Sequence, residues 1–291
     1  MRAFVFPGQG SQSVGMGKAL ADASPAAREL FQEVDDALSH HLFRLMVEGP
    51  EDRLTLTENA QPAIMANAIA TLRVMQREGG FSIAQKGDYV AGHSLGEYSA
   101  LCAAEALDAG TTARLLRLRG QAMQAAVPVG EGAMAALLGA DIEKAQALAD
   151  AAAQGEVCAV ANDNDPSQVV ISGHKAAIDR AVAMVKEHGI KRGILLPVSA
   201  PFHCELMQPA ADAMATGLGV GGVGGAAAAG LRQCAGRADR RAGRDQAAAG
   251  GASDRPGTLA RVRGGNVGRG RYRVRGSGWQ GVDPDDQAHR P

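Results

Sequence analysis

Aromatic residues are scarce in this sequence. Phe, Trp and Tyr make up 3% of its 291 residues, whereas hydrophobic residues as a whole make up 46%. The chain is therefore apolar enough for one or two folded domains, but their cores have to be packed mainly from Ala, Leu, Val, Ile and Met. No apolar run approaches the roughly 20 residues that a membrane-spanning helix requires. We therefore expect no membrane segment.

Cysteine is also rare, and its spacing argues against a disulfide framework. The four cysteines are Cys102, Cys158, Cys204 and Cys234, with no CxxC pair among them. Isolated thiols of this kind are typical of a reducing compartment. The first residues, MRAFVFPGQG, begin a strand and a turn at once, so we also expect no signal peptide. Together these features predict a cytoplasmic protein.

Residues 221–291 lack five residue types altogether: Phe, Ile, Met, Lys and Glu. Gly, Ala and Arg account for 43 of these 71 residues, and 13 Arg against 6 Asp give the segment a net charge of +7. Residues 1–220 carry 17 Lys and Arg against 25 Asp and Glu, a net charge of −8. The segment is either a disordered Arg/Gly-rich tail of the kind that binds nucleic acid, or the product of a shifted reading frame in GC-rich DNA. We favour the second interpretation and expect no nucleic-acid partner.

Residues 1–220, in contrast, show a regular alternation of strand and helix patterns. In chain order these are a strand at 2–8, helices at 24–39 and 60–80, a strand at 88–92, and helices at 94–110 and 111–127. Ser24 and Pro25 suit the N-cap and the first position of the first long helix. Such alternation is typical of an α/β fold with a mainly parallel sheet.

Between residues 130 and 200 the order of the elements changes. The pattern there predicts strand, helix, strand, strand, helix and strand, at 132–140, 141–155, 156–164, 167–174, 175–189 and 192–200. This is the order of ferredoxin-like folds. We therefore predict a large α/β catalytic domain from residues 1–128 and 199–220, an inserted ferredoxin-like subdomain at 129–198, and a Gly/Ala/Arg-rich segment at 221–291 that is out of frame or disordered.

The stretch Gly92-His93-Ser94-Leu95-Gly96 lies between a predicted strand and a predicted helix. This is the context of the nucleophile elbow of α/β hydrolases, in which two glycines allow a sharp turn around an exposed serine. Backbone N–H groups at the start of the following helix then hold an oxyanion. The alternative is that Ser94 only caps the helix at an ordinary strand-to-helix turn. We favour an α/β-hydrolase-like large domain with Ser94 as nucleophile.

A serine nucleophile needs a base to accept its proton. Of the seven histidines, His40 and His41 fall at a helix end and are expected to be exposed, and the side chain of His93 is expected to point away from the elbow. His203, in the stretch PVSAPFHCELM, lies where the chain returns to the large domain. We therefore choose His203 as the base; the alternative is a histidine packed within a loop.

Arg119 falls in the middle of the apolar face of the helix predicted at 111–127. A buried guanidinium has to be paired, because leaving its charge unpaired costs several kcal/mol. The partner is either a carboxylate of the protein or a carboxylate of a substrate, which the planar fork of arginine grips with two hydrogen bonds. Because a serine acyl-transfer site is predicted nearby, we favour the substrate.

Six motifs in series resemble one known family. They are FPGQGSQ, GHSLGEYSA, RLRGQAMQ, GAMAALLG, QVVISGH and PVSAPFHCELMQPAA. In this order they are similar to the malonyl-CoA:acyl carrier protein transacylases of bacterial fatty-acid synthesis, and the resemblance runs from Phe4 to about Leu218. The acyltransferase domains of polyketide synthases share the pattern.

The resemblance implies a role for each matched residue. Ser94 would carry the acyl group, His203 would act as general base and acid, and Arg119 would bind the carboxylate of malonate. Gln9 and the backbone N–H of Leu95 would form the oxyanion hole. Asn162 and Asn164 would lie near the active-site cleft. The implied partners are malonyl-CoA and acyl carrier protein; no metal or other cofactor is implied, and we expect a monomer.

From about residue 219 the sequence departs from the family. Because the family continues with further strands and helices, we expect this chain to fold poorly or to be inactive as written. Three alternatives remain at this stage: an esterase-like serine hydrolase, a nucleic-acid-binding protein that uses the Arg/Gly-rich segment, and an inactive product of a shifted gene. Arg119 and the GQGSQ loop argue against the esterase.

Overall fold

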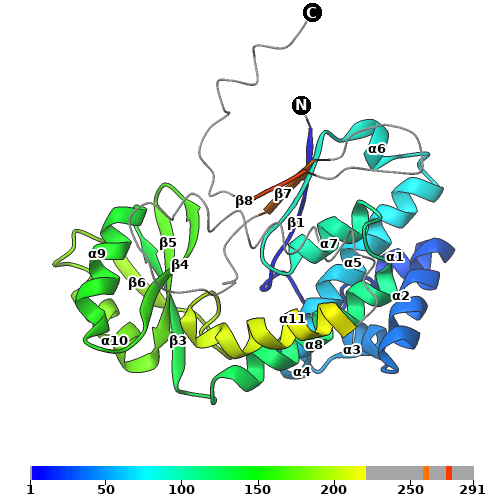
Figure 1. Cartoon of the computed structure of the whole chain (residues 1–291). Coiled ribbons are helices and arrows are strands. Elements are labelled where there is room, and N and C mark those ends of the chain that lie inside the picture. The colour runs from blue at the N-terminus through cyan, green and yellow to red at the C-terminus, as the bar shows by residue number, and fades with distance from the viewer. Residues whose placement is uncertain (1, 221–257, 262–272, 277–291) are drawn as a thin grey trace, which may run out of the picture.

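The computed structural model describes residues 2–220, 258–261 and 273–276, which form two lobes (Figure 1). The larger lobe contains β1 (Ala3–Phe6), α1 (Lys18–Ala23), α2 (Pro25–Leu38), α3 (Leu42–Glu48), α4 (Glu51–Thr55), α5 (Thr57–Arg77), α6 (Ile83–Lys86), β2 (Tyr89–Gly92), α7 (Gly96–Ala103), α8 (Ala109–Ala126), β7 (Thr258–Arg261) and β8 (Arg273–Gly276). The smaller lobe contains β3 (Gly132–Leu138), α9 (Ile142–Ala153), β4 (Cys158–Asp165), β5 (Gln168–His174), α10 (Lys175–Met184) and β6 (Arg192–Leu195). The chain then returns through the 3-10 helix η1 (Glu205–Met207) and α11 (Gln208–Val220).

The sheet of the larger lobe has the order β1-β2-β7-β8. β1 and β2 are parallel, as the sequence predicts, but β7 pairs with β2, and β8 with β7, in antiparallel fashion. The predicted α/β fold with parallel strands is confirmed for β1 and β2, and the antiparallel half comes from two strands that the sequence did not predict. Periodicity gave no signal for β7 and β8, which are four residues each and lie in the Gly/Ala/Arg-rich segment. The rest of that segment lies outside the described residues, so the prediction of disorder there is not tested.

The two faces of the β1–β2 pair differ in burial. On one face Phe6 and Val90 are 7% and 0% exposed and belong to the main core with Ile64 of α5 and Leu95. On the other face Val5 is 70% exposed. Strands of parallel sheets that are apolar on both faces are normally covered on both. The described helices therefore cover one face of this pair and leave the other open.

Capping residues set the ends of the helices that flank the site. Ser24 caps α2 as predicted, because its Oγ accepts a hydrogen bond from the N–H of Ala27. The helix predicted at 94–110 ends instead at Ala103, and Glu105 has a left-handed φ of 59°. Asp108 then caps α8 by accepting from the N–H of Thr111 at 2.7 Å. This N-cap, which the sequence analysis placed inside a helix, separates α7 from α8.

The smaller lobe is a four-stranded antiparallel sheet of order β4-β5-β3-β6. Its elements follow the order strand, helix, strand, strand, helix, strand that the sequence predicts, with all six between residues 132 and 195. α9 and α10 pack on one face of this sheet around Leu148, Ile171 and Ile178, which are all fully buried. This lobe therefore has a core of its own.

The long helix α8 connects the two lobes along the base of the molecule, with α11 beside it (Figure 1). Its closest partner is α5. A Cβ on Gly120 would lie 2.5 Å from the Cα of Glu58 and 2.7 Å from the carbonyl oxygen of Thr57, so only glycine permits this approach. The approach brings the inward side chains of α8 next to those of α5.

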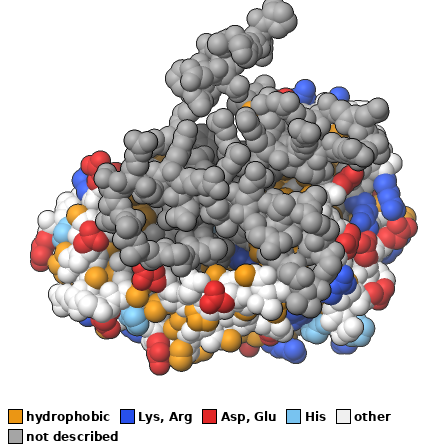
Figure 2. Space-filling view, viewed as in Figure 1, with side chains coloured by type: hydrophobic (Ala, Val, Ile, Leu, Met, Phe, Trp, Pro, Cys, Tyr) orange, Lys and Arg blue, Asp and Glu red, His pale blue; other side chains and the backbone are white. Residues whose placement is uncertain are grey.

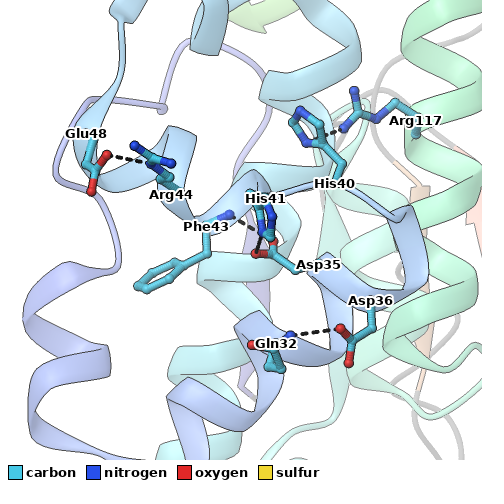
Figure 3. A network of polar contacts seen from close by, with 9 residues as sticks. All are labelled: Gln32, Asp35, Asp36, His40, His41, Phe43, Arg44, Glu48 and Arg117. Carbon is cyan, nitrogen blue, oxygen red and sulfur yellow. Dashed lines mark hydrogen bonds and ion pairs between the residues drawn. The ribbon is translucent and has the colours of Figure 1, made fainter.

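A polar network fixes the outer side of α8 (Figure 3). Nη1 of Arg117 donates to Oδ1 of Asn59 at 2.8 Å, and Nη2 lies 3.1 Å from Nδ1 of His40. His40 is thus partly buried, and the prediction that it is exposed is wrong because its partner comes from α8, 77 residues away. His41 is exposed as predicted. Acidic and basic side chains are interspersed on the part of the surface at the right of Figure 2.

Candidate functional site

Ser94 lies at a sharp turn between β2 and α7, with a left-handed φ of 53°. A non-glycine residue with this φ is strained, and such strain is common where a side chain is presented for function. The flanking glycines make the turn possible. A Cβ on Gly92 would lie 1.9 Å from the carbonyl carbon of Gly96, and a Cβ on Gly96 would lie 2.4 Å from the carbonyl oxygen of Phe6. The stretch therefore has the strand-turn-helix geometry of a nucleophile elbow.

The N-terminus of α7 offers backbone donors beside Ser94. The N–H of His93 donates to the carbonyl of Phe6 at 3.1 Å, whereas among the described residues the N–H groups of Ser94 and Leu95 donate to no backbone acceptor. Leu95 itself is the N-cap residue of α7, and its side chain is 1% exposed. N–H groups at a helix start favour negative charge. This arrangement suits an oxyanion next to the serine.

Arg119 is buried against Ser94. Its side chain is 3% exposed, and Nη2 donates to Oγ of Ser94 at 3.2 Å. Nη1 donates to Oε1 of Gln61 at 2.8 Å, and the guanidinium lies 5.9 Å from the centre of the Tyr98 ring. The predicted burial of Arg119 on the apolar face of α8 is confirmed. The positive charge stands beside the position where an acyl group on Ser94 would extend.

Gln61 is a residue of the site that no sequence pattern indicated. It is 1% exposed on α5, where its Oε1 accepts from Arg119 and its Nε2 lies 3.5 Å from Sδ of Met123. Both ends of the amide are thus engaged, which fixes the orientation of the guanidinium. The available signal was a glutamine within the otherwise apolar stretch AQPAIM.

Gln9 lies in the loop after β1 and is tied to two other segments. Its Nε2 donates to Oγ1 of Thr57 at 3.2 Å, and that hydroxyl lies 3.2 Å from Oγ of Ser199. The carbonyl of Ser199 in turn accepts from Nε2 of Gln124 on α8, at 3.4 Å. The loop that carries Gln9 and the loop that leads to His203 are therefore linked through one buried threonine.

His203 lies in the turn between β6 and η1, with a left-handed φ of 61°. It is the second residue of the site in this uncommon conformation. Its charge is one of the causes that lower the pKa of His93, which places the two imidazoles near each other. The turn is held locally, since Sγ of Cys204 donates to the carbonyl of Pro201 at 3.2 Å. His203 thus lies where the chain returns from the smaller lobe to η1 and α11.

The two asparagines differ in position. Asn162 is 6% exposed, at an irregularity in the pairing of β4, and its Nδ2 lies 3.4 Å from Nε2 of His93. Asn164 is exposed, and its Nδ2 donates to Oε1 of Gln168 at 3.1 Å within the β4–β5 hairpin. The structure therefore brings Asn162 to the elbow and does not bring Asn164 there.

Two further kinds of site have no counterpart among the described residues. Within residues 2–220, 258–261 and 273–276, no three His, Cys, Asp or Glu side chains gather closely enough to bind a metal ion. In the same part of the chain, no helix combines the length and the apolar character needed to cross a membrane.

Comparison with known proteins places this site in a family. Residues 3–221 match the acyl transferase domain family. The malonyl CoA-acyl carrier protein transacylase of Escherichia coli K12 is 48% identical over 216 residues, which cover 74% of this chain and 69% of that protein. The solved acyl-carrier-protein-S-malonyltransferase of Bartonella henselae is 55% identical with a TM-score of 0.73, covering 76% of this chain and 70% of that one.

A third relative was solved with its partner. It is a malonyl-transacylase in complex with a type II PKS acyl-carrier protein; it is 46% identical, with a TM-score of 0.71 over 75% of this chain and 69% of that one. The family match ends at residue 221, where the composition changes, and about a quarter of this chain lies outside each structural comparison. On these matches, and on the elbow, the buried arginine and the histidine turn, the chain belongs to the acyl transferase domain family, among the malonyl-CoA:acyl carrier protein transacylases.

Proposed function

We propose that this chain transfers a malonyl group from malonyl-CoA to the phosphopantetheine thiol of acyl carrier protein through an ester on Ser94. The observation that carries the proposal is the placement of the Arg119 guanidinium 3.2 Å from the Ser94 hydroxyl. A hydrolase of simple esters has no use for a buried cation at that point. The half-thioester of a dicarboxylic acid carries a free carboxylate, which a guanidinium can bind with two hydrogen bonds.

In the first half-reaction, Oγ of Ser94 attacks the thioester carbonyl while His203 accepts its proton. The C–S bond then breaks, and the sulfur of coenzyme A leaves with the proton that His203 returns. His203 therefore acts as base and then as acid. The link from Ser199 through Thr57 to Gln9 supports this role, because it fixes the loop four residues before the histidine.

The negative charge that develops on the thioester oxygen needs donors. We assign these to the backbone N–H of Leu95 and the side-chain amide of Gln9. The N–H is directed from the start of α7, and Gln9 is held by Thr57 at 3.2 Å. Donors fixed before the reaction stabilise the transition state by about 2.7–4 kcal/mol each.

Selectivity for malonyl rests on Arg119 and Gln61. The amide of Gln61 leaves the Nη2 edge of the guanidinium directed at Ser94, where the free carboxylate of a malonyl ester would lie. Gripping that carboxylate also fixes the ester in one orientation for attack by the second thiol. The acyl-enzyme is then transferred to the phosphopantetheine thiol by the reverse path, as in other ping-pong reactions.

We further propose that the two lobes correspond to an α/β-hydrolase-like domain (1–128 and 199–220) and a ferredoxin-like subdomain (129–198), with Asn162 lining the cleft between them. The strand order β4-β5-β3-β6 supports the second assignment. Asn164, exposed on the hairpin, has no contact that supports a role. We also propose a monomer that works in the cytoplasm.

The test is transfer itself. The full chain is mixed with malonyl-CoA and a holo acyl carrier protein, and malonyl carrier protein is measured by mass spectrometry. We expect malonyl transfer that depends on Ser94 and is absent with Ser94→Ala. Hydrolysis of p-nitrophenyl esters without any malonyl transfer would instead identify the chain as an esterase.

A further inference from the structure

His93 precedes the nucleophile, and its ring lies between two segments that come from different lobes. On one side Nε2 is 3.4 Å from Nδ2 of Asn162 on β4. On the other side the ring lies against the backbone of Gly8, where an added Cβ would be 2.4 Å from Nδ1. Gly8 directly precedes Gln9, the side chain that we assign to the oxyanion hole. The ring therefore occupies the space between β4 and the Gly8–Gln9 turn, which we call the oxyanion loop.

The Asn162 contact fits a neutral ring. When Nδ2 of the amide donates to Nε2, the ring nitrogen accepts, and the neutral ring then carries its proton on Nδ1. The surroundings favour this state. Desolvation, then the positive charges of His203 and Arg119, lower the pKa of His93 below its ordinary value. The groups packed on the ring from β4 and from the oxyanion loop, Asn162 and Gly8, carry no charge of their own.

We propose that His93 is a positioning residue for acyl transfer: as a neutral ring it joins Asn162 of the smaller lobe to the Gly8–Gln9 turn and so holds the oxyanion loop in register with Ser94. This inference rests on the proposed function. It assigns no proton transfer to His93, whose Nε2 faces Asn162. It assigns Asn162 to the same unit, acting through His93.

The inference predicts a specific pattern among substitutions. His93→Phe keeps the size of the ring but cannot accept from Asn162, so the oxyanion loop loses its anchor to β4. His93→Gln can present an amide oxygen to Asn162 in place of Nε2. Asn162→Ala removes the same contact from the other side. Two changes that break one contact are not additive, so the double variant should behave like either single variant.

The first experiment measures malonylation of Ser94 in the full chain by acid-quenched intact mass spectrometry, over a range of malonyl-CoA concentrations. His93→Phe and Asn162→Ala should each lower the maximal rate about 10–100-fold while leaving the half-saturating concentration nearly unchanged. His93→Gln should recover most of the rate. The double variant should be no slower than the slower single variant.

Equal rates of malonylation for wild type and His93→Phe would overturn the inference. So would a double variant whose loss of rate equals the product of the two single losses. His41→Gln, a change at an exposed histidine outside the site, is the control and should match wild type.

The second experiment does not depend on activity. The ring of His93 is followed by ¹³C–¹H NMR during a pH titration of the full chain, with the His93→Gln variant to assign its signal. We expect the Nδ1-protonated neutral form to persist below pH 6.5, the ordinary value for this group. A ring that is charged at that pH would overturn the inference. If the wild-type chain takes up no malonyl group, the proposed function is wrong. The coupling of His93 and Asn162 is still tested in that case, by the titration and by the thermal unfolding of His93→Phe, Asn162→Ala and the double variant.

Discussion

Arg119 donates a hydrogen bond to Ser94 although the two residues lie on different elements, 25 positions apart in the sequence. The contact exists because Gly120 allows α8 to approach α5, and because the elbow presents Ser94 at the start of α7. It places a permanent positive charge next to the hydroxyl that we propose becomes acylated. A carboxylate at the far end of the acyl group can therefore pair with Arg119, whereas an acyl group that lacks a carboxylate cannot.

Arg119→Ala should separate the two kinds of acyl donor. Malonyl transfer should fall by at least about 30-fold, since removing one partner of a buried charge pair costs about 2 kcal/mol or more. Acetyl transfer from acetyl-CoA should be retained or should rise, because acetyl has no carboxylate. Initial rates with the two donors provide the measurement. Equal loss with both donors would contradict a carboxylate-binding role.

Gly96→Ala should damage the elbow itself. The new Cβ would lie 2.4 Å from the carbonyl oxygen of Phe6, so β1 and α7 would have to separate. We expect the free energy of unfolding to drop by about 1–3 kcal/mol and malonylation of Ser94 to be lost. Gly110→Ala is a matched control in the first turn of α8, where the nearest atom is the Cβ of Ala37 at 3.2 Å. Unfolding in urea should show little change for Gly110→Ala, and a similarly mild effect at Gly96 would argue against a rigid elbow.

The contact between His40 and Arg117 should make stability depend on pH. Desolvation and the charge of Arg117 lower the pKa of His40 below 6.5; Arg53 and His41 act in the same direction, and Asp35 opposes them. The unfolded chain therefore binds the proton more readily than the folded chain. The contribution of neutral His40 to the free energy of unfolding is fully present above about pH 6.5, and it is lost as the pH falls through the pKa of His40 in the folded protein.

This dependence can be measured by thermal unfolding between pH 7.5 and pH 5. Below pH 6.5 the melting temperature of the wild type should decrease as the pH is lowered. The melting temperature of His40→Gln should decrease less steeply, because glutamine does not titrate. The same slope in both proteins would show that other groups, His93 among them, account for the loss.

The thiols should be unreactive in the folded protein. Cys102, Cys158 and Cys204 are buried and unpaired with one another, and burial raises the pKa of Cys102 and of Cys158 to about 11 each. The thiolate fraction at pH 8 is then roughly 100-fold below that of an ordinary thiol. Peptide mapping after brief iodoacetamide treatment should find these three unmodified until urea is added. Complete labelling in urea provides the reference, and Cys234 lies outside the described residues.

Local patterns predicted those parts of the site that depend on one segment. The elbow follows from glycine spacing at a strand-to-helix junction, and the burial of Arg119 follows from its position on the apolar face of α8. Gln61 was missed because its role comes from the packing of α5 against α8, 58 residues away. His40 was misplaced for the same reason. Contacts between distant segments leave no periodic trace in either segment.

The open face of the β1–β2 pair is relevant to whether the chain folds stably with residues 221–291 as its C-terminal segment. Val5 is 70% exposed in strands that are apolar on both faces, and the family match ends at residue 221. The sequence suggested that the chain folds poorly or is inactive as written, which is the alternative to the malonylation of Ser94 that the site supports. A calorimetric scan of the full chain separates the two: a broad, weak transition would support poor folding, and a sharp cooperative one would contradict it.

The most direct test of the account is the covalent state of Ser94. The full chain is mixed with malonyl-CoA in the absence of carrier protein, quenched in acid, digested and sequenced by tandem mass spectrometry. We predict one malonyl group on the peptide that contains Ser94 and none in Ser94→Ala. An unmodified Ser94 in protein that unfolds cooperatively would contradict the account.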